Sequence, residues 1–170
     1  LGPWCTDEDL TKVLMMLPEG SVLACGHTHR SMDRVVSRGR VVNTGSVGLP
    51  FNGDRRAQYA IISRTSDADD WEVELRAIPY DLSHIFDLYE RSGFLDAGGI
   101  TSRMLRLELE RARPFLVPFL RWADAFSFDP SLAPTHDFLS IYDPDAPTEH
   151  FYELLSTLRP ARAVSTKPTT

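Results

Sequence analysis

Apolar side chains at the start of the chain recur first at helical and then at strand spacing. Four of them mark one helical face: Leu10, Val13, Leu14 and Leu17. Thr6, followed by Asp9, is typical of a helix cap, and Pro18 and Gly20 end the pattern. The next segment, "SVLACG", is short, apolar and bounded by glycine, which favours a buried strand. The pattern therefore predicts a helix that leads into a strand.

Strand-like patterns continue to residue 80. The stretch "RVVSRGRVVNTGS" predicts two short strands about a turn at Gly39, and "AQYAIISRT" and "WEVELRAIPY" predict two more. The tract from Thr65 to Asp70 between the last two is small, polar and acidic, which predicts a hairpin loop. We therefore treat residues 1–80 as one unit, a helix followed by several strands.

From Asp81 the apolar spacing becomes helical. Asp81 caps a helix that ends near Gly93, and its apolar face is formed by Leu82, Ile85, Phe86 and Tyr89. A glycine-rich turn, "DAGGIT", then leads into a second helix from about Thr101. The apolar side of that second helix is formed by Leu105, Leu109 and Ala112.

Prolines shape the rest of the chain. Pro114 and Pro118 interrupt the aromatic stretch "PFLVPFLRW", which predicts a broken or kinked helix. Proline-rich loops then lead to a last helix that contains Phe151, Leu154, Leu155 and Leu158. We expect a helical extension over residues 81–160 and a flexible tail over residues 161–170.

Composition narrows the class of protein. With 170 residues, 42% hydrophobic and 25% charged, the chain is typical of a globular protein of one domain, or of one domain with an appendage. A net charge of −6 disfavours a broad basic surface for nucleic acid. No run is apolar enough to span a membrane, no signal peptide is recognisable, and only two cysteines occur, so we predict a cytoplasmic location.

The segment "ACGHTHRS" carries the clearest chemistry. His27 and His29 are two residues apart in an extended segment, so both imidazoles can project into one space. They follow the end of a predicted strand, where ligands gather in α/β proteins, and Gly26 allows a sharp turn. Metal ligation is one interpretation, and two solvated or structural histidines in a loop is the other.

A second loop, "NTGSVGLPFNGDRRAQYAII", follows the next strand pair. Asn43 and Ser46 stand at its start, and its glycines can bring backbone N–H groups toward an anion. Taken alone, this loop is more simply an ordinary turn between strands. The two segments together are much more specific than either one.

Residues 25–62, "CGHTHRSMDRVVSRGRVVNTGSVGLPFNGDRRAQYAII", resemble the carboxyl-terminal signature of the calcineurin-like metallophosphoesterases, particularly their small bacterial and archaeal phosphodiesterase branch. In that family a G-H-x-H motif precedes a strand, an N-P-G-S-V-G loop and another strand. Thr44 stands where proline is usual, at a position that is not a ligand. The resemblance implies an α/β (α+β) fold, a four-layer α/β/β/α sandwich. Residues 1–80 would supply one half of it, ahead of the helical extension.

The resemblance also implies a reaction. Family members hydrolyse phosphate esters, as phosphodiesterases or phosphatases, with a bridging hydroxide held by two divalent transition metal ions, Mn, Fe, Zn or Ni. By motif matching, His27 would ligate one metal ion and His29 the other. Three residues would contact the substrate, a phosphate-ester small molecule or nucleotide: Asn43, Ser46 and Arg55. Arg55 and its neighbour Arg56 could instead be solvated residues after an Asn-Gly turn.

Most of the family's metal ligands are missing from this chain. The D-x-H, G-D-x-x-D and G-N-H-[DE] motifs are absent, and two histidines cannot hold two metal ions tightly. The chain starts with Leu1 and not with methionine. We therefore expect the carboxyl-terminal portion of a longer enzyme, inactive alone, whose partner is the missing amino-terminal half of the same domain.

Three alternatives stay open. The first is a non-catalytic binding or scaffold module on a degenerate metallophosphoesterase framework. The second is a structural zinc site made of Cys5, Cys25, His27 and His29. The third concerns five aromatic residues, which pack a core by default but could line a pocket or a homo-oligomer interface: Phe115, Phe119, Trp122, Phe126 and Phe128. Three further histidines are simplest as surface residues: His84, His136 and His150.

Overall fold

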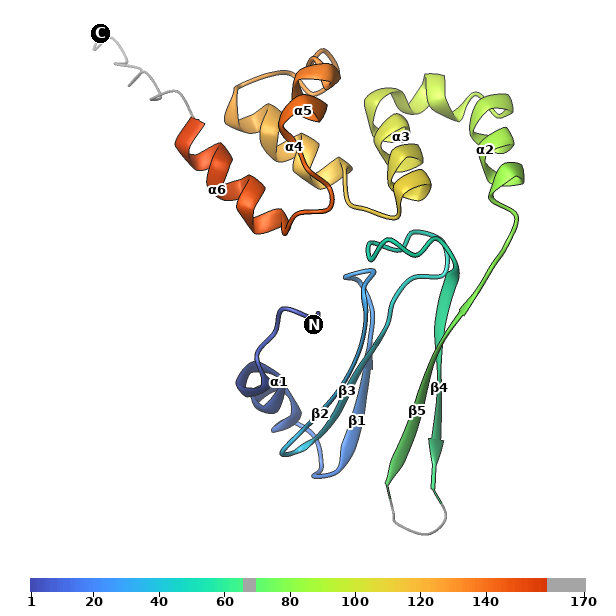
Figure 1. The fold of residues 1–170 in the computed structure, drawn as a ribbon, viewed down its shortest axis with the longest axis vertical. Coiled ribbons are helices and arrows are strands. Elements are labelled where there is room, and N and C mark those ends of the chain that lie inside the picture. Colours follow the sequence, from blue (N-terminus) through green and yellow to red (C-terminus); the bar gives the residue numbers. More distant parts are fainter. Residues whose placement is uncertain (66–69, 159–170) are drawn as a thin grey trace, which may run out of the picture.

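The computed structural model describes residues 1–65 and 70–158 and has a mixed α+β fold (Figure 1). In chain order the elements are α1 (Asp7–Leu14), β1 (Ser21–Cys25), β2 (Ser31–Val36), β3 (Gly39–Thr44), β4 (Ala57–Arg64), β5 (Trp71–Ile78), α2 (Leu82–Arg91), α3 (Phe94–Arg111), α4 (Leu116–Ala125), α5 (Thr135–Ile141) and α6 (Thr148–Leu158). None of the helices within the described residues combines the length and apolar character needed to cross a bilayer.

Helix α1 begins where its sequence predicts. The Thr6 hydroxyl accepts the Asp9 N–H at 3.2 Å, and the Asp9 carboxylate accepts the Thr6 N–H at 3.1 Å, which together form a capping box. Leu10 is fully buried in a small core beside the first sheet. The other buried members of this core are Leu14, Met32 and Val41.

Strand β3 is the centre of a three-stranded sheet. It pairs in parallel with β1 and antiparallel with β2, with Cys25 opposite Asn43 in the first pair. The prediction of two strands here is confirmed, although Gly39 begins β3 and does not sit inside the turn. Because β1 and β3 run in the same direction, the loops that follow them start at the same edge of the sheet.

Strands β4 and β5 form a separate antiparallel hairpin, with Ala57 opposite Ile78. Both strands are as predicted. The Thr65 N–H donates to Asp70 O at 2.9 Å, but most of the hairpin loop predicted between them, residues 66–69, lies outside the described residues.

The predictions about the middle helices hold only in part. The glycine-rich segment does interrupt the helix, because Gly99 (φ 53°, ψ −129°) is a kink between the two helical pieces that make up α3, but the first piece already begins at Phe94. Pro118 does not break the following helix, because α4 begins at Leu116 and places Pro118 in its first turn. A helix has no internal partner for its first N–H groups, so proline loses no hydrogen bond there.

The last part of the chain contains one helix that the sequence pattern missed. Helix α5 occupies part of the stretch expected to form proline-rich loops, and its seven residues are too few for a clear apolar period. Helix α2 is capped by Asp81 as predicted, and α6 is confirmed, with Phe151 and Leu155 buried. The tail predicted over residues 161–170 lies outside the described residues.

The helical extension has a core of its own. Three of the five aromatic residues considered for that role are buried in it: Phe115, Phe119 and Trp122. Phe126 is half-buried, and Phe128 is 40% exposed. Helices α2 to α6 gather beyond the end of the strands where the loops after β1 and β3 lie (Figure 1). This arrangement places the helical extension over the loop that contains the two histidines.

Candidate functional site

The loop between β1 and β2 has an unusual backbone at both histidines. His27 (φ 74°) and His29 (φ 57°) adopt left-handed conformations, which few residues other than glycine occupy. Each such conformation costs about 1–2 kcal/mol and persists only where its surroundings impose it. Backbone strain of this kind concentrates at functional sites, so the pair is a candidate on structural grounds as well as on sequence.

His29 is fixed by the loop that follows β3. Its Nδ1 lies 2.7 Å from Leu49 O, and because a carbonyl oxygen only accepts, Nδ1 carries the proton. The imidazole stacks on Phe51 with ring centroids 4.8 Å apart, and the Phe51 N–H donates to His29 O at 2.8 Å. In the neutral ring, Nε2 then carries a free lone pair, as a metal ligand requires.

His27 is more open. Its side chain is exposed, and it forms no hydrogen bond within residues 1–65 and 70–158. It lines a cleft of about 950 Å³ between its own loop and the helical extension. His27 is therefore accessible to a ligand from this cleft.

The side chain of Asn43 anchors the histidine loop, residues 26–30 between β1 and β2. Its side chain is fully buried, and its Nδ2 donates to Gly26 O at 3.2 Å, to the Thr28 hydroxyl at 2.8 Å and to Leu1 O at 2.8 Å. Its Oδ1 accepts the Gly45 N–H at 3.0 Å. Asn43 therefore positions the loop, and its predicted contact with a substrate stays a prediction.

Ser46 shapes the second loop, which follows β3. Its hydroxyl accepts the Leu49 N–H at 3.0 Å, which shapes the turn that brings Leu49 O to His29. Neither Ser46 nor Asn43 lines the cleft that contains His27. The structure therefore joins the two motifs through the side-chain hydrogen bonds of Asn43 and His29, and Phe51 and Asn52 bring the second loop to the cleft wall.

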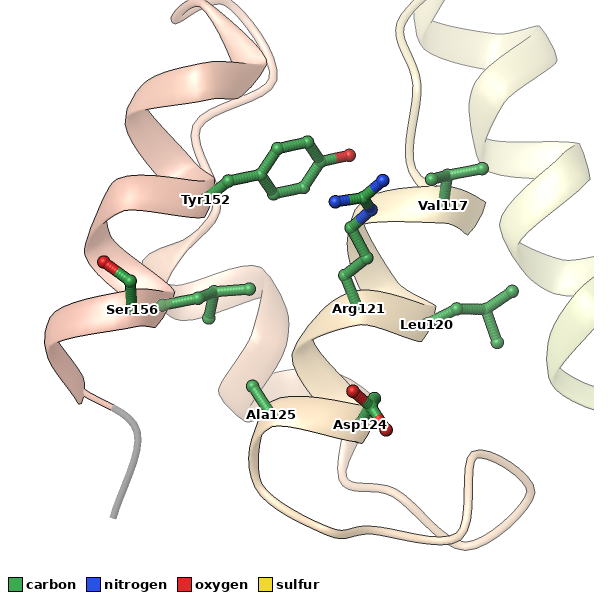
Figure 2. Close-up of a pocket in the computed structure, with 8 residues that line it drawn as sticks. Val117, Leu120, Arg121, Asp124, Ala125, Tyr152 and Ser156 are labelled. Carbon is green, nitrogen blue, oxygen red and sulfur yellow. The ribbon is translucent and has the colours of Figure 1, made fainter. Parts of the chain in front are cut away.

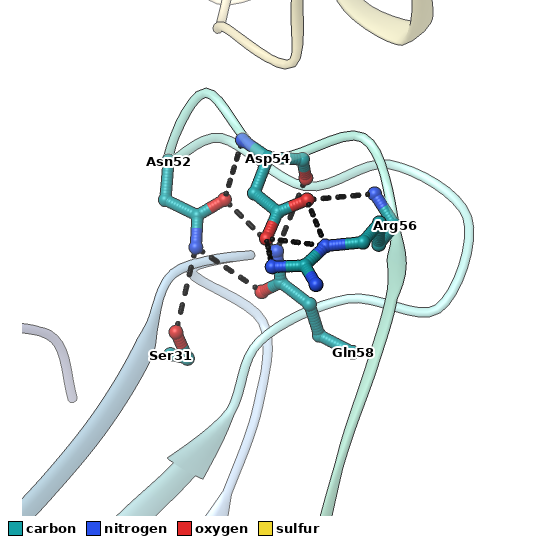
Figure 3. A network of polar contacts seen from close by, with 5 residues as sticks. All are labelled: Ser31, Asn52, Asp54, Arg56 and Gln58. Atoms are coloured by element: carbon teal, nitrogen blue, oxygen red, sulfur yellow. Dashed lines mark hydrogen bonds and ion pairs between the residues drawn. The ribbon is translucent and has the colours of Figure 1, made fainter. Parts of the chain in front are cut away.

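A polar network anchors the far part of the second loop (Figure 3). Arg56 pairs with the Asp54 carboxylate at 2.7 Å, and its hydrogen bonds lower the pKa of Asp54 below the ordinary value. Gln58, almost fully buried, donates to Asn52 Oδ1 at 2.9 Å. Arg55 is exposed and lines a different hollow with Pro79, Tyr80 and Leu82, and it does not line the cleft beside His27.

Charged residues that sequence reasoning did not select line the cleft, Arg30 and Glu108 among them. Arg30 directly follows the histidine pair, and Glu108 comes from α3, about eighty residues later. Glu108 is only 3% exposed, and burial raises its pKa, while hydrogen bonds from two backbone N–H groups and the charge of His29 oppose the rise. A signal for Glu108 existed, because it interrupts the apolar side of α3 between Leu105 and Leu109.

The zinc alternative is not assembled. Cys5 and Cys25 are both free and half-buried beside the small core, and burial raises the pKa of the Cys25 thiol. Within residues 1–65 and 70–158, no three His, Cys, Asp or Glu side chains are grouped so that they could hold a metal ion. A third His, Cys, Asp or Glu does not join His27 and His29 within the described residues, and their ligation of a metal ion stays a prediction.

Comparisons with known proteins identify no family for this chain. No protein-family model matches the chain, and no curated protein matches it. Among solved structures, a hypothetical protein from Pyrococcus horikoshii OT3 is similar over 54% of this chain and 35% of its own, with 21% sequence identity and a TM-score of 0.46. This chain thus spans about a third of the length of that structure.

Proposed function

We propose that this chain supplies His27 and His29 to the dinuclear metal centre of a calcineurin-like metallophosphoesterase, a hydrolase of phosphate mono- or diesters. The observation that carries the proposal is the hydrogen bond between His29 Nδ1 and Leu49 O, which leaves Nε2 as a free donor. Imidazole nitrogen suits Mn, Fe, Zn and Ni. The succession of G-H-x-H and N-x-G-S-V-G segments supports the same assignment.

The roles of the chain's own residues follow from their contacts. When bound, two divalent ions would activate the attacking water and offset charge on the phosphoryl oxygens. The second loop holds the imidazole of His29 in one tautomer, and Asn43 holds the backbone on either side of His27. Because imidazole must be neutral to coordinate, metal affinity should fall as pH drops through the histidine range.

The remaining ligands have to come from outside the described residues. We propose an amino-terminal half of the same domain, carrying the D-x-H, G-D-x-x-D and G-N-H-[DE] motifs. The sheets of the described chain are compatible with such a partner: β1 pairs on one side only, and β4 and β5 form a sheet of two strands. Open edges of this kind accept further strands, as a four-layer α/β/β/α sandwich would require.

The test compares His29 with a histidine outside the site. Metal content and hydrolysis of bis(p-nitrophenyl) phosphate with Mn²⁺ would be measured on the full-length product. His29→Ala should reduce turnover by at least about 100-fold, because a metal ligand matters at least as much as the groups that orient it. His84→Ala, at an exposed position in the first turn of α2, is the matched control. Full metal content and turnover in a folded His29→Ala variant would refute the proposal.

One observation favours a second candidate, a non-catalytic binding module on the same framework. His27 lines the cleft and His29 does not, and within the described residues no group of three His, Cys, Asp or Glu side chains could hold a metal ion. On this alternative the full-length product would bind no transition metal and hydrolyse no phosphodiester. It would also be indifferent to His29→Ala.

A further inference from the structure

The cleft beside His27 has the size of a site for a small organic molecule. Its volume of about 950 Å³ lies at the upper end of the range for such sites. One wall is the histidine loop with Thr28 and Arg30, and the other comes from α3, α4 and the segment before α6. Any ligand that reaches His27 through this cleft also meets the helical extension.

Most charged groups in the cleft already have partners. Arg113 pairs with Asp145 at 2.8 Å. The Arg121 guanidinium lies 4.5 Å from the centre of the Tyr152 ring, at the point where the cleft meets the groove between α4 and α6 (Figure 2). Glu149 is exposed at the start of α6, where water solvates it. These groups shape the wall and leave little charge for a ligand.

Arg30 is different. It is half-buried and has no hydrogen bond or ion pair with any residue in 1–65 and 70–158. A guanidinium carries five N–H donors in a planar fork that matches phosphate or carboxylate oxygens. The nitrogens of Arg30 are not among the buried side-chain atoms that lack a partner in the described residues, so water reaches the guanidinium and a ligand oxygen can replace that water. Arg30 is therefore available for an anionic oxygen in the cleft.

Glu108 can accept a hydrogen bond from a ligand, whereas Arg30 can only donate one. Its Oε1 accepts both the Phe115 N–H at 2.7 Å and the Leu116 N–H at 2.8 Å, which caps the start of α4. Its Oε2 has no hydrogen bond within the described chain, although the residue lines the cleft. The pKa of Tyr142 is raised mainly by burial, and the charges of Glu108 and Arg30 act on it with opposite signs. The carboxylate and the guanidinium are thus within electrostatic reach of the same phenol.

We propose that Arg30 and Glu108 select the ligand of this cleft, Arg30 by binding an anionic oxygen and Glu108 Oε2 by accepting a hydrogen bond from a donor on the same molecule. The ligand class is a phosphate ester whose organic group carries a hydroxyl or an amine. This inference rests on the proposed function in treating the cleft as the substrate side of a phosphoesterase site. It assigns the helical extension a role in recognition.

Three probes separate the two contacts: glycerol 1-phosphate, methyl phosphate and glycerol. Binding to the protein would be measured by NMR titration in the presence of EDTA, so that neither metal nor turnover contributes. Glycerol 1-phosphate should bind about tenfold more tightly than methyl phosphate, and glycerol not measurably. Arg30→Ala should weaken the binding of both phosphates by about tenfold or more. Arg103→Ala, at an exposed position on α3, controls for the lost positive charge.

Glu108→Gln tests the acceptor without removing the cap. Its side-chain oxygen can still receive the two backbone N–H groups, and an amide nitrogen replaces Oε2. The preference for glycerol 1-phosphate should disappear, while affinity for methyl phosphate should stay the same or rise, because loss of the carboxylate removes a negative charge from the cleft. If Glu108 only caps α4, Glu108→Gln would keep the preference for glycerol 1-phosphate, and that result would overturn the inference. Unchanged phosphate binding in Arg30→Ala would also overturn it. A metal-dependent hydrolase that binds both phosphates equally would refute this inference and leave the proposed function standing.

Discussion

Replacing Asn43 with alanine tests whether one buried amide holds the histidine loop in place. The side chain is fully buried, three acceptors surround its Nδ2, and its Oδ1 receives the Gly45 N–H. Gly26 O and the Thr28 hydroxyl, two of these acceptors, flank His27 in the chain. Loss of the amide therefore releases the segment that carries the proposed ligand.

The size of the effect follows from these four hydrogen bonds. Each is worth about 1 kcal/mol net, and a buried group left without a partner costs about 1–3 kcal/mol. Gly26 is exposed and Thr28 is half-buried, so water can replace some of the lost partners. We therefore expect Asn43→Ala to lower the free energy of unfolding by about 3 kcal/mol, less than the roughly 4 kcal/mol that four full hydrogen bonds would give.

Urea unfolding followed by circular dichroism measures this loss. Asn52→Ala is the matched control, because Asn52 is exposed and its amide donates only long hydrogen bonds, at 3.3 and 3.4 Å. Its Oδ1 accepts Gln58 Nε2 at 2.9 Å, but Gln58 keeps a second acceptor in Asp54 O, so the loss should cost about 1 kcal/mol. Asn43→Asp should lower the free energy of unfolding at least as much as Asn43→Ala, because the carboxylate keeps the acceptor but buries a charge. A loss in Asn43→Ala no larger than in Asn52→Ala would refute the reasoning.

Three further predictions follow from the described contacts. Gly45→Ala should lower the free energy of unfolding by about 2–3 kcal/mol, because φ is 81° and a Cβ would collide with Gln58; Gly20→Ala, with φ 77° and open space, should lose only about 1 kcal/mol in the same urea assay. Phe119→Ala should cost about 3–5 kcal/mol by thermal or urea unfolding, because the ring is fully buried. The native state raises the pKa of Glu108 above 4.5, so its contribution to stability is present below that pH and is lost as pH rises through the raised value. The free energy of unfolding of Glu108→Gln, measured at a series of pH values, should therefore rise relative to that of the wild type above pH 4.5. A difference that stays constant with pH would contradict this.

Local signals explain which elements could be predicted from sequence. The Thr6 cap, the apolar run before Gly26 and the Asp81 cap each act over a few residues, so their effect is visible in the pattern itself. The boundaries of α3 and the existence of α5 were missed. Gly99 absorbs a kink with positive φ inside α3, and packing in the helical core, not periodicity, sustains so short a helix as α5.

The candidate site divides in the same way. His27 and His29 are recognisable because their spacing and their place after a strand are local features. The positioning role of Asn43 depends on the parallel pairing of β1 and β3, which places Asn43 opposite Cys25 and beneath the next loop. Arg55 was selected from its place in the sequence, but it lines a different hollow from His27.

The contribution of the helical extension depends on a contact that no local pattern contains. The Gly53 N–H in the second loop donates to Ala112 O at the end of α3 at 3.0 Å, and a Cβ at Gly53 would collide with Arg113. The same loop holds His29 through Leu49, so one segment sets the position of the imidazole relative to Glu108. The histidine loop and α3 are therefore placed by a common support. Recognition in the cleft should consequently depend on residues 81–158 even though the proposed metal ligands lie wholly outside them.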